Sequence, residues 1–572
     1  MPLHNSDVAE AFDEMADLLE IEGANVFRVR AYRNAARTLR GLSRGVAGMV
    51  AGAEDLSELP AIGEDLAEKI RTMVGTGRLP ELEELKDQLP EGLVAVLGIS
   101  GLGPKRVKAL HRELGIEDLD GLAEAAREGR IRLIEGFGEK TEANILHALE
   151  TRGSGESRTL LREAEARAEP LVAHLSAAEG AEQVTVAGSY RRRKETVGDL
   201  DILVACEDSG PVMARLTGHE DVTEVISQGE TRSTVVLRNG LQVDLRAVPP
   251  ESHGAALHYF TGSKAHNIHV RRMGQGRGLK INEYGVFDGD TRLAGETEAE
   301  VYDRVGLPWI PPELREDRGE IEAAGRGELP ELLTLDDIRG NLHAHTDWSD
   351  GTASAREMAE AAKARGWEYL AITDHSKAVR VANGLDADRL AAQIDEIEAL
   401  DAEIDGIAVL SSVEVDILED GSLDLPDHIL SRLDLVTCAV HSHFRLSRER
   451  QTARLCRAMD NPHVSILAHP TGRMIGSREP YPLDMEALAS HAAETGVALE
   501  INAQPQRLDL DDRHARMAAE AGARLAIGTD AHAPDHLDVM RHGVDQARRA
   551  WLRAEDVVNT RPLPALRKLL SR

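Results

Sequence analysis

The chain has 572 residues, of which 42% are hydrophobic and 29% charged, and its formal net charge at pH 7 is −32. This length is too great for one hydrophobic core and predicts about three or four domains of an ordinary soluble globular protein. No apolar run approaches the roughly 18 residues of a membrane span, and the N-terminus lacks a signal-peptide pattern. The widely separated Cys206, Cys438 and Cys456 exclude a disulfide framework, so we expect a reducing cytoplasm. The acidic balance lowers the expectation of nucleic-acid binding without excluding it, because local basic patches such as residues 191–194 decide phosphate contact.

Residues 1–150 are predicted to form helices joined by short connectors. Within residues 7–20 the apolar side chains recur with a helical period, at Val8, Phe12, Met15, Leu18 and Leu19. Residues 81–150 continue as helical segments interrupted by Gly-x-Gly turns, and residues 151–160 have the composition of a linker.

One pattern repeats within this helical region, at a spacing of about 35–40 residues. Its copies are Leu59-Pro-Ala-Ile-Gly63, Ile99-Ser-Gly101-Leu-Gly103 and Ile134-Glu-Gly136-Phe-Gly138. Such a turn presents backbone N–H groups at a helix N-terminus, where the helix dipole favours an anion. A single copy is most simply a glycine-capped turn, but three copies resemble helix–hairpin–helix motifs and favour binding of the DNA backbone. The candidate DNA contacts are Gly63, Gly101, Gly103, Lys105, Gly136 and Gly138.

From residue 184 the pattern changes to short β-rich runs that carry three aspartates. Asp199 and Asp201 lie two residues apart on one predicted strand, so both carboxylates face the same side. Asp244 lies on a later predicted strand. Three clustered carboxylates are unstable without cations, and paired Mg²⁺ ions on such a set can drive phosphoryl transfer. Asp-x-Asp alone fits solvated turn residues equally well, but the Gly188-Ser189 turn before it and the third aspartate after it favour a nucleotidyltransferase.

Further motifs follow these aspartates in a fixed order, at Tyr259-Phe-Thr-Gly-Ser263, Asn267, Arg271 and Asn282-Glu-Tyr284. With the repeated turns, residues 1–315 resemble a family X DNA polymerase of the DNA polymerase beta type. The resemblance implies that Asp199, Asp201 and Asp244 are catalytic and bind Mg²⁺ or Mn²⁺, with primer-template or gapped DNA and dNTPs as partners. The nucleotide-binding residues that it implies are Gly188, Ser189, Arg192, Gly198, Tyr259, Phe260, Gly262, Asn267 and Arg271.

The resemblance also raises the question of a lyase. Lys69 matches the position of a Schiff-base lysine that removes 5′-deoxyribose phosphate in some members of the family. The neighbouring basic residues differ here, because Asp65 and Phe27-Arg28 stand in their places. A lysine nucleophile needs a depressed pKa and basic neighbours, so Lys69 is interpreted as a surface helix residue with lyase activity as the alternative.

Residues 311–335 are rich in Pro, Gly and Glu, show little periodic structure and are predicted to be a linker. After them strand-like runs alternate with Ala-rich helices, which predicts βα repeats and a barrel-like sheet. Six short clusters of His, Asp and Glu follow, at residues 341–350, 373–375, 414–416, 441–443, 468–470 and 528–532. These side chains are ligands of Zn²⁺, Mn²⁺ and Fe²⁺. One His-x-His is unremarkable, but the whole series predicts a metal centre.

This series resembles a PHP (polymerase and histidinol phosphatase) domain over residues 338–572. The resemblance implies a site for three Mn²⁺ and/or Zn²⁺ ions in a distorted (βα)7 barrel. His343, His345, Glu414 and Asp530 would hold one ion, Glu414, His441 and His469 the second, and Asp350, His375 and His532 the third. Water between the ions would supply a hydroxide for phosphoester hydrolysis. Arg473 is a candidate ligand of the substrate phosphate.

The sequence therefore predicts a multidomain α/β protein with an all-α helix–hairpin–helix N-terminal region, a nucleotidyltransferase-type α+β palm and a C-terminal PHP barrel. The predicted parts are 1–80 (lyase-type helical), 81–152 (helix–hairpin–helix), 153–250 (palm), 251–315 (nucleotide selection), 316–337 (linker) and 338–572 (PHP). We expect a monomeric, cytoplasmic, gap-filling repair polymerase with a Mn²⁺-dependent 3′–5′ exonuclease. Two alternatives remain, a polymerase with a purely structural PHP domain and a phosphoesterase whose polymerase core only positions DNA. A non-enzymatic DNA-end scaffold would leave both sets of candidate catalytic residues unexplained.

Overall fold

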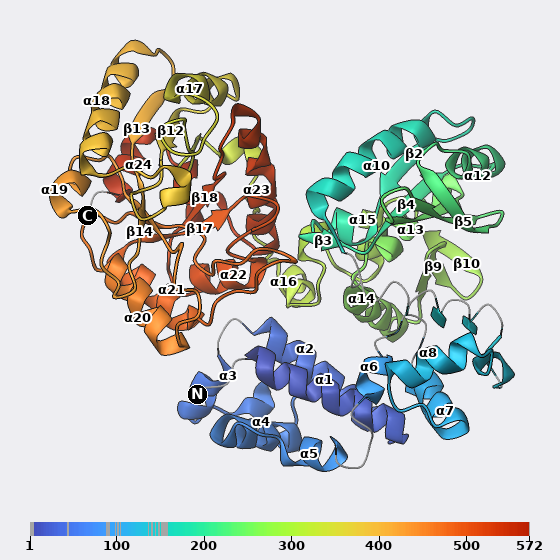
Figure 1. Ribbon diagram of the computed structural model, residues 1–572. Coiled ribbons are helices and arrows are strands. Elements are labelled where there is room, and N and C mark those ends of the chain that lie inside the picture. Colours follow the sequence, from blue (N-terminus) through green and yellow to red (C-terminus); the bar gives the residue numbers. More distant parts are fainter. Residues whose placement is uncertain are drawn as a thin grey trace. The chain divides into compact units, whose positions relative to one another are not determined.

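The computed structural model describes residues 5–42, 45–86, 92–97, 99, 102, 104–134, 136–138, 141–142, 145–146, 149 and 158–570. The chain divides into two compact units, Met1–Ser157 and Arg158–Arg572 (Figure 1). None of the helices within these described ranges has the length and apolar character needed to cross a membrane.

The first unit is helical in its described residues, as predicted. Its elements are α1 (Asn5–Glu22), α2 (Val26–Gly41), α3 (Val46–Ala51), η1 (Leu56–Glu58), α4 (Glu64–Thr76), α5 (Pro80–Lys86), α6 (Leu93–Leu97), α7 (Pro104–Leu114), α8 (Leu119–Arg127) and η2 (Ile131–Leu133). The periodic residues of the predicted helix form the buried face of α1, where the ring of Phe12 meets that of Tyr32 edge-on at 5.4 Å. Asn25 caps the start of α2 by accepting from the backbone N–H of Phe27, and Gly77 ends α4 in the left-handed conformation.

The second unit begins with a mixed sheet whose strands lie in the order β2-β4-β7-β6-β5. These strands are β2 (Gln183–Val186), β4 (Asp199–Ala205), β5 (Val222–Gln228), β6 (Arg232–Leu237) and β7 (Gln242–Val248), and the short β1 (Thr159–Leu160) pairs with β3 (Thr196–Val197). The β-rich runs of the sequence thus became strands. The helices α10 (Leu161–Ser176) and α12 (Gly210–Thr217) pack on this sheet, and their apolar side chains share one core with it.

A smaller α+β region accompanies the sheet, and all its elements except α11 follow β7 in the chain. It comprises α11 (Gly188–Arg191, between β2 and β3), η4 (Pro250–Ser252), α13 (His253–Thr261), α14 (Lys264–Gly276), β8 (Lys280–Asn282), β9 (Gly285–Asp288), β10 (Thr291–Ala294), α15 (Glu298–Arg304) and η5 (Pro312–Leu314). The expectation of little regular structure in residues 311–335 was wrong. They contain η5 and α16 (Glu320–Arg326), and Ile321, Ala324 and Leu332 are buried in the core of this region.

The C-terminal region, residues 338–570, alternates short parallel strands with helices. Its strands are β11 (Gly340–Asn341), β12 (Tyr369–Ile372), β13 (Ala408–Ser411), β14 (Glu414–Asp416), β15 (Thr437–Ala439), β16 (Ile466–Leu467), β17 (Ala498–Asn502) and β18 (Leu525–Gly528). They form two parallel sheets, β11-β12-β13 and β14-β15-β16-β17-β18. Parallel bridges at Ala344–Ala531 and His375–Glu414 join the two sheets. A fully closed barrel stays a prediction.

Helices surround these strands, as Figure 1 shows. They are η6 (Leu335–Asp337), α17 (Ala355–Ala364), η7 (Arg380–Ala382), α18 (Ala387–Glu403), α19 (Asp427–Leu430), α20 (Arg448–Met459), α21 (Met485–Thr495), α22 (Asp512–Glu520), η8 (Pro534–Val539), α23 (Met540–Arg549), η9 (Ala554–Asp556), η10 (Val558–Thr560) and α24 (Leu563–Leu570). The strands are buried on both sides, which explains their continuous apolar runs.

Candidate active sites

The three predicted catalytic aspartates lie on neighbouring strands. β4 and β7 run parallel, and Asp201 is directly paired with Asp244. The carboxylate of Asp244 accepts hydrogen bonds from Arg232 Nη2 (2.8 Å), Thr234 Oγ1 (2.6 Å) and Gln242 Nε2 (2.7 Å). Burial alone would raise the pKa of Asp244, but these bonds outweigh it and lower the pKa.

The other two aspartates lack this compensation. Burial, followed by the negative charges of its neighbours, raises the pKa of Asp201 to about 7, and burial with the charge of Asp244 raises that of Asp199. A divalent cation would relieve this repulsion, so the donors suit Mg²⁺ or Mn²⁺. Among the described residues, the carboxylate oxygens of the three aspartates do not all lie within 4.8 Å of one another. Asp244 is held by its own three donors instead.

The predicted phosphate-binding turn abuts these carboxylates. Gly188 begins α11 with φ +61°, and a Cβ there would lie 2.3 Å from Asp201 Oδ2, so only glycine fits. Ser189 is the next residue of α11, and Gly198 immediately precedes β4. Arg192 donates from Nη1 to the carbonyl of Thr261 and from Nε to Glu316 Oε1 at 3.1 Å.

The predicted sugar- and base-contacting residues lie at the junction of α13 and α14. A Cβ at Gly262 would lie 3.2 Å from Arg192 Nη1, which brings this junction next to the turn. Tyr259 and Phe260 lie at the end of α13 with ring centroids 5.1 Å apart. Asn267 donates to the carbonyl of Tyr259 at 2.6 Å, while its own Oδ1 is buried without a hydrogen-bond partner. Arg271 is exposed on α14.

The candidate DNA contacts of the first unit are open where they are described. Gly63 begins α4, and an added Cβ at Gly63, Gly136 or Gly138 would meet nothing within 4 Å, so their backbone is approachable. Lys105 is exposed on α7. Gly101 and Gly103 lie outside the described residues.

Lys69 differs from the surface residue that was expected. Its side chain is only 13% exposed, and Nζ contacts Asp65 Oδ1 at 2.5 Å and Glu81 Oε1 at 3.6 Å. Burial alone would lower the pKa of Lys69, but the carboxylates and Tyr32 outweigh it and raise the pKa. The amine is therefore held in its charged form, which is not nucleophilic.

The nine predicted metal ligands of the C-terminal region lie after its parallel strands, with Glu414 at the start of β14, shortly after the end of β13. Each follows or begins a strand: His343, His345 and Asp350 follow β11, His375 follows β12, Glu414 begins β14, His441 follows β15, His469 follows β16, and Asp530 and His532 follow β18. Parallel strands bring their carboxyl ends to one edge, which is why His343 and His532, 189 positions apart in the sequence, converge.

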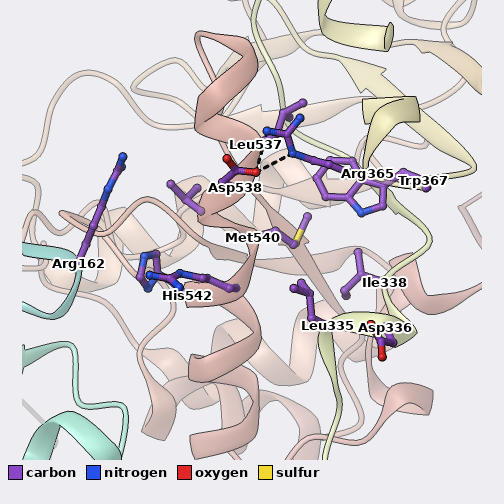
Figure 2. A pocket seen from close by; sticks show the side chains of 13 residues that line it. Arg162, Leu335, Asp336, Ile338, Arg365, Trp367, Leu537, Asp538, Met540 and His542 are labelled. Atoms are coloured by element: carbon purple, nitrogen blue, oxygen red, sulfur yellow. Dashed lines mark hydrogen bonds and ion pairs between the residues drawn. The ribbon is translucent and has the colours of Figure 1, made fainter. Parts of the chain in front are cut away.

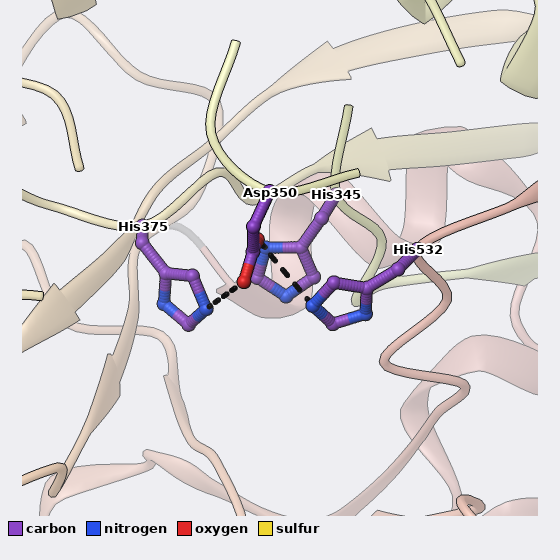
Figure 3. Close-up of side chains that lie close together, drawn as sticks. All are labelled: His345, Asp350, His375 and His532. Atoms are coloured by element: carbon purple, nitrogen blue, oxygen red, sulfur yellow. Dashed lines mark ion pairs between the residues drawn. The ribbon is translucent and has the colours of Figure 1, made fainter. Parts of the chain in front are cut away.

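Their ligand atoms form three groups, each with all atoms within 4.8 Å of one another. The groups are His345, Asp350, His375 and His532 (Figure 3), then His343, His345 and Asp530, and finally His375, Glu414 and His441. His345 and His375 belong to two groups each, whereas the prediction gave each one ion. His469 lies outside the three groups, but its Nε2 is 2.8 Å from Glu414 Oε1.

The unsatisfied atoms of this cluster suit cations. His343 Nε2, both ring nitrogens of His345, His375 Nδ1 and Glu414 Oε2 are buried and form no hydrogen bond of good geometry. His375 Nδ1 nevertheless lies 2.8 Å from Glu414 Oε2, and His345 Nε2 lies 3.1 Å from Asp530 Oδ1. Buried polar atoms normally find a partner, and imidazole nitrogens and carboxylates converging in this way are ligands of Zn²⁺ or Mn²⁺.

The electrostatics of the cluster point the same way. Burial lowers the pKa of His441, but the neighbouring Glu414 and Asp416 raise it to about 9. Burial also lowers the pKa of His532, but Asp350 and Asp530 outweigh burial and raise this pKa to about 9. The carboxylates therefore attract positive charge strongly, and divalent ions would supply it in place of protons.

Two carboxylates behind the ligands complete the arrangement. Glu500 Oε1 lies 2.6 Å from Nδ1 of His343, and Asp416 Oδ1 lies 3.0 Å from Nδ1 of His441. Each carboxylate holds the Nδ1–H tautomer and so directs Nε2 into the centre. The sequence analysis included Asp416 in a cluster but missed the role of Glu500. The feature that could have indicated this role is that Glu500 is a charged residue inside the buried strand β17.

Arg473, the candidate phosphate ligand, forms contacts within the protein. Its Nη2 donates to Glu195 Oε2 at 2.7 Å and to the carbonyl of Leu508, and its Nη1 lies 4.0 Å from Asp511. The side chain is 11% exposed. The guanidinium is thus engaged by Glu195 and Leu508 while its Nε is buried without a hydrogen-bond partner, and the role of Arg473 as a phosphate ligand stays a prediction.

A pocket of about 740 Å³ lies apart from these sites (Figure 2). Its apolar wall includes Trp367 and Met540, and Arg365 at its side is paired with Asp538 at 2.7 Å. None of the predicted site residues lines it.

Family models match five consecutive parts of the chain. They describe a helix-hairpin-helix domain (residues 3–79), a SAM-like helix-hairpin-helix tandem (93–151), a DNA polymerase beta palm (161–269), a DNA polymerase beta thumb (256–316) and a PHP domain (341–504). The predicted domain boundaries themselves stay predictions.

Relatives match either the whole chain or its last part. The chain is 40% identical over 577 aligned positions to the DNA polymerase/3'-5' exonuclease PolX of Bacillus subtilis (strain 168), covering 100% of both chains. It is 31% identical over 231 residues to a probable phosphatase of Thermoanaerobacter sp. (strain X514), covering 38% of this chain and 89% of that protein. A probable phosphatase of Syntrophotalea carbinolica is 30% identical over 230 residues, covering 38% of this chain and 90% of that protein.

Proposed function

Because the chain belongs to the PolX family of DNA polymerases with a C-terminal PHP domain, we propose that it fills short gaps in DNA and trims DNA 3′ ends. The observation that carries the proposal is the presence of two sets of metal-binding side chains in one chain. One is the aspartates on β4 and β7, and the other is the eight grouped donors of the PHP region, with His469 beside Glu414.

In the polymerase reaction Asp199, Asp201 and Asp244 would hold two Mg²⁺ or Mn²⁺ ions. These ions would supply the chemistry of activating the primer 3′-hydroxyl and stabilising the leaving pyrophosphate. Gly188 and Ser189 offer backbone and hydroxyl donors to the triphosphate of a dNTP, and Arg192 adds charge-assisted bonds. Tyr259 and Phe260 would pass the sugar, while Asn267 and Arg271 would contact the nascent base pair.

In the second reaction the PHP region acts as a 3′–5′ exonuclease with up to three Mn²⁺ and/or Zn²⁺ ions. These metals would lower the pKa of bound water and so supply the hydroxide for phosphodiester hydrolysis. Glu500 and Asp416 orient two of the imidazoles. We place this activity in DNA repair of the base-excision type, in the cytoplasm, with the chain acting as a monomer on gapped or primer-template DNA. The lyase reaction is not part of the proposal, because Lys69 is held charged by its carboxylate partners.

The test uses a 5′-labelled primer on gapped duplex DNA with dNTPs and Mn²⁺. Asp199→Ala/Asp201→Ala is expected to lose extension but keep 3′ shortening, and His343→Ala/His345→Ala is expected to show the reverse. Extension without shortening under any metal would give the PHP region a structural role. Shortening without extension would reduce the central region to a DNA-positioning module.

A second candidate activity concerns 3′ phosphates. The relatives named as probable phosphatases match the PHP region alone, and a hydroxide at a metal centre attacks phosphomonoesters as well as diesters. A primer ending in a 3′-phosphate is then expected to lose inorganic phosphate before it is extended. Extension that is blocked indefinitely by the 3′-phosphate would exclude this activity.

A further inference from the structure

The PHP region contacts the nucleotide-binding turn of the polymerase region directly. Residues 192–195 follow the turn formed by Gly188 and Ser189, and three of these four residues are bound by PHP side chains. Arg193 donates to Asp545 at 2.8 Å, and Glu195 accepts from Arg473 at 2.7 Å. The third contact comes from Arg549, at the end of α23.

Arg549 is the most buried of these contacts, with 2% of its side chain exposed. Its Nη1 donates to the backbone carbonyl of Arg192 at 2.6 Å and lies 3.3 Å from Glu316 Oε1. Its Nη2 donates to Asp512 Oδ2 at 2.7 Å. Arg549 therefore holds the backbone of the residue expected to bind the triphosphate and also contacts that residue's partner.

Glu316 is shared between two arginines. The same oxygen, Oε1, accepts from Arg192 Nε at 3.1 Å and from Arg549 Nη1 at 3.3 Å. Burial alone would raise the pKa of Glu316, but Arg549 and Arg192 lower it to about 2, so it is an anion at neutral pH. Arg192 thus has an anionic partner that competes with a triphosphate for this guanidinium.

We propose that Arg549 is a positioning residue of the polymerase reaction, because it shares Glu316 with Arg192 and thereby lets Arg192 exchange Glu316 for the triphosphate. When Arg192 turns to phosphate, Arg549 keeps Glu316 neutralised, so no buried charge is left unpaired. Without Arg549, Glu316 keeps its hydrogen bond to Arg192 but loses the one to Arg549, and it therefore competes more strongly with the nucleotide for Arg192. The PHP region then tunes dNTP affinity through this contact, independently of its metal centre. The inference rests on the proposed polymerase function.

The experiment compares full-length Arg549→Ala, Arg549→Lys, Glu316→Gln and Arg549→Ala/Glu316→Gln with the wild type. Arg548→Ala is the matched control, because Arg548 is the preceding residue of α23 and pairs with Glu313 at 2.8 Å rather than with the turn. For each variant the KM for dNTP and the kcat of gap filling are measured, together with 3′ shortening and the melting temperature. A wild type that extends the primer is the precondition, and its failure would defeat the proposed function and the inference together.

We expect Arg549→Ala to raise the KM for dNTP roughly 5- to 50-fold, with a smaller change in kcat and normal 3′ shortening. Arg549→Lys is expected to lie between it and the wild type, because a point charge serves Glu316 but not all three acceptors. Glu316→Gln added to Arg549→Ala should reverse most of the KM increase. An unchanged KM in Arg549→Ala would overturn the inference. A KM for dNTP in the double variant as high as that of Arg549→Ala would also overturn it. So would equal losses of extension and shortening in Arg549→Lys, since these results indicate a merely structural role.

Discussion

Glu500 is expected to control the metal centre although it is not itself a ligand. Its Oε1 lies 2.6 Å from Nδ1 of His343, and its Oε2 accepts from the backbone N–H of His469 at 2.9 Å and from Asn502 at 3.2 Å. Glu500→Gln keeps the shape but removes the charge and presents an amide in place of one oxygen. The preference for the Nδ1–H tautomer of His343 is then weakened, and with it the supply of a free Nε2 to a metal.

Loss of such a partner typically costs 10- to 100-fold in metal affinity or activity, or roughly 1.4–2.7 kcal/mol. We therefore expect Glu500→Gln to bind Mn²⁺ at least about tenfold more weakly, by calorimetric titration, and to shorten 3′ ends correspondingly slowly at limiting Mn²⁺. Gap filling should be unchanged, since Glu500 lies in the PHP region. Glu494→Gln, an exposed glutamate of α21, is the control for the amide substitution. Wild-type Mn²⁺ affinity together with a wild-type rate of shortening in Glu500→Gln would refute the reasoning.

Three further predictions follow from the site and its surroundings. Burial, and next the charge of Arg315, hold the pKa of His258 well below its usual value. The neutral imidazole therefore contributes its full stabilisation of the fold above about pH 6.5. Below that pH the free energy of unfolding falls by up to about 1.4 kcal/mol per pH unit, because the unfolded chain takes up a proton on His258 and the folded chain does not. Urea unfolding at pH 7.5 and 5.5 should therefore show a smaller acid loss in His258→Phe than in the wild type, and an equal loss would contradict the assignment. Gly188→Ala should abolish gap filling, because its methyl group would meet the Asp201 carboxylate at 2.3 Å, whereas Gly180→Ala, with φ +77° but open space, should retain it. Removal of metal with a chelator should lower the melting temperature, and Mn²⁺ at about 100 times its Kd should restore about 2.7 kcal/mol; the double-histidine variant should lack this response if the ions bind where we propose.

The strands and the sites they carry were predictable because their pattern is local. The runs at residues 242–245, 498–501 and 525–528 all became strands, since apolar and β-branched residues bounded by turn residues leave few alternatives. Two aspartates spaced by one residue on such a strand must share a face, and the structure places Asp244 beside Asp201. The ligand clusters were recognisable because they follow parallel strands whose ends meet.

The remaining features depend on contacts between distant parts of the chain. Glu500 is 157 positions from His343, and no local pattern marks a strand carboxylate as the partner of one imidazole among many. Residues 311–335 were misjudged by composition, although Gly319 and Gly327, both left-handed, bracket the seven-residue helix α16. Gly319 caps the start of the helix and Gly327 its end, and the buried Ile321 and Ala324 pack it into the core.

Because the chain is negatively charged, we expect the cations of both sites to be needed for DNA binding as well as for the reactions. A protein with net charge −32 repels DNA at long range, and both sites concentrate carboxylates where a phosphate must arrive. A DNA end can approach such a carboxylate set only when cations are already bound there, so metal should be required for end binding and not only for turnover. DNA affinity measured with the Asp199→Ala/Asp201→Ala variant separates these roles. If bridging by metal dominates, this variant loses the increase in affinity that Mg²⁺ brings at the primer end. If repulsion by the bare carboxylates dominates, the same variant binds DNA more tightly than the wild type without metal.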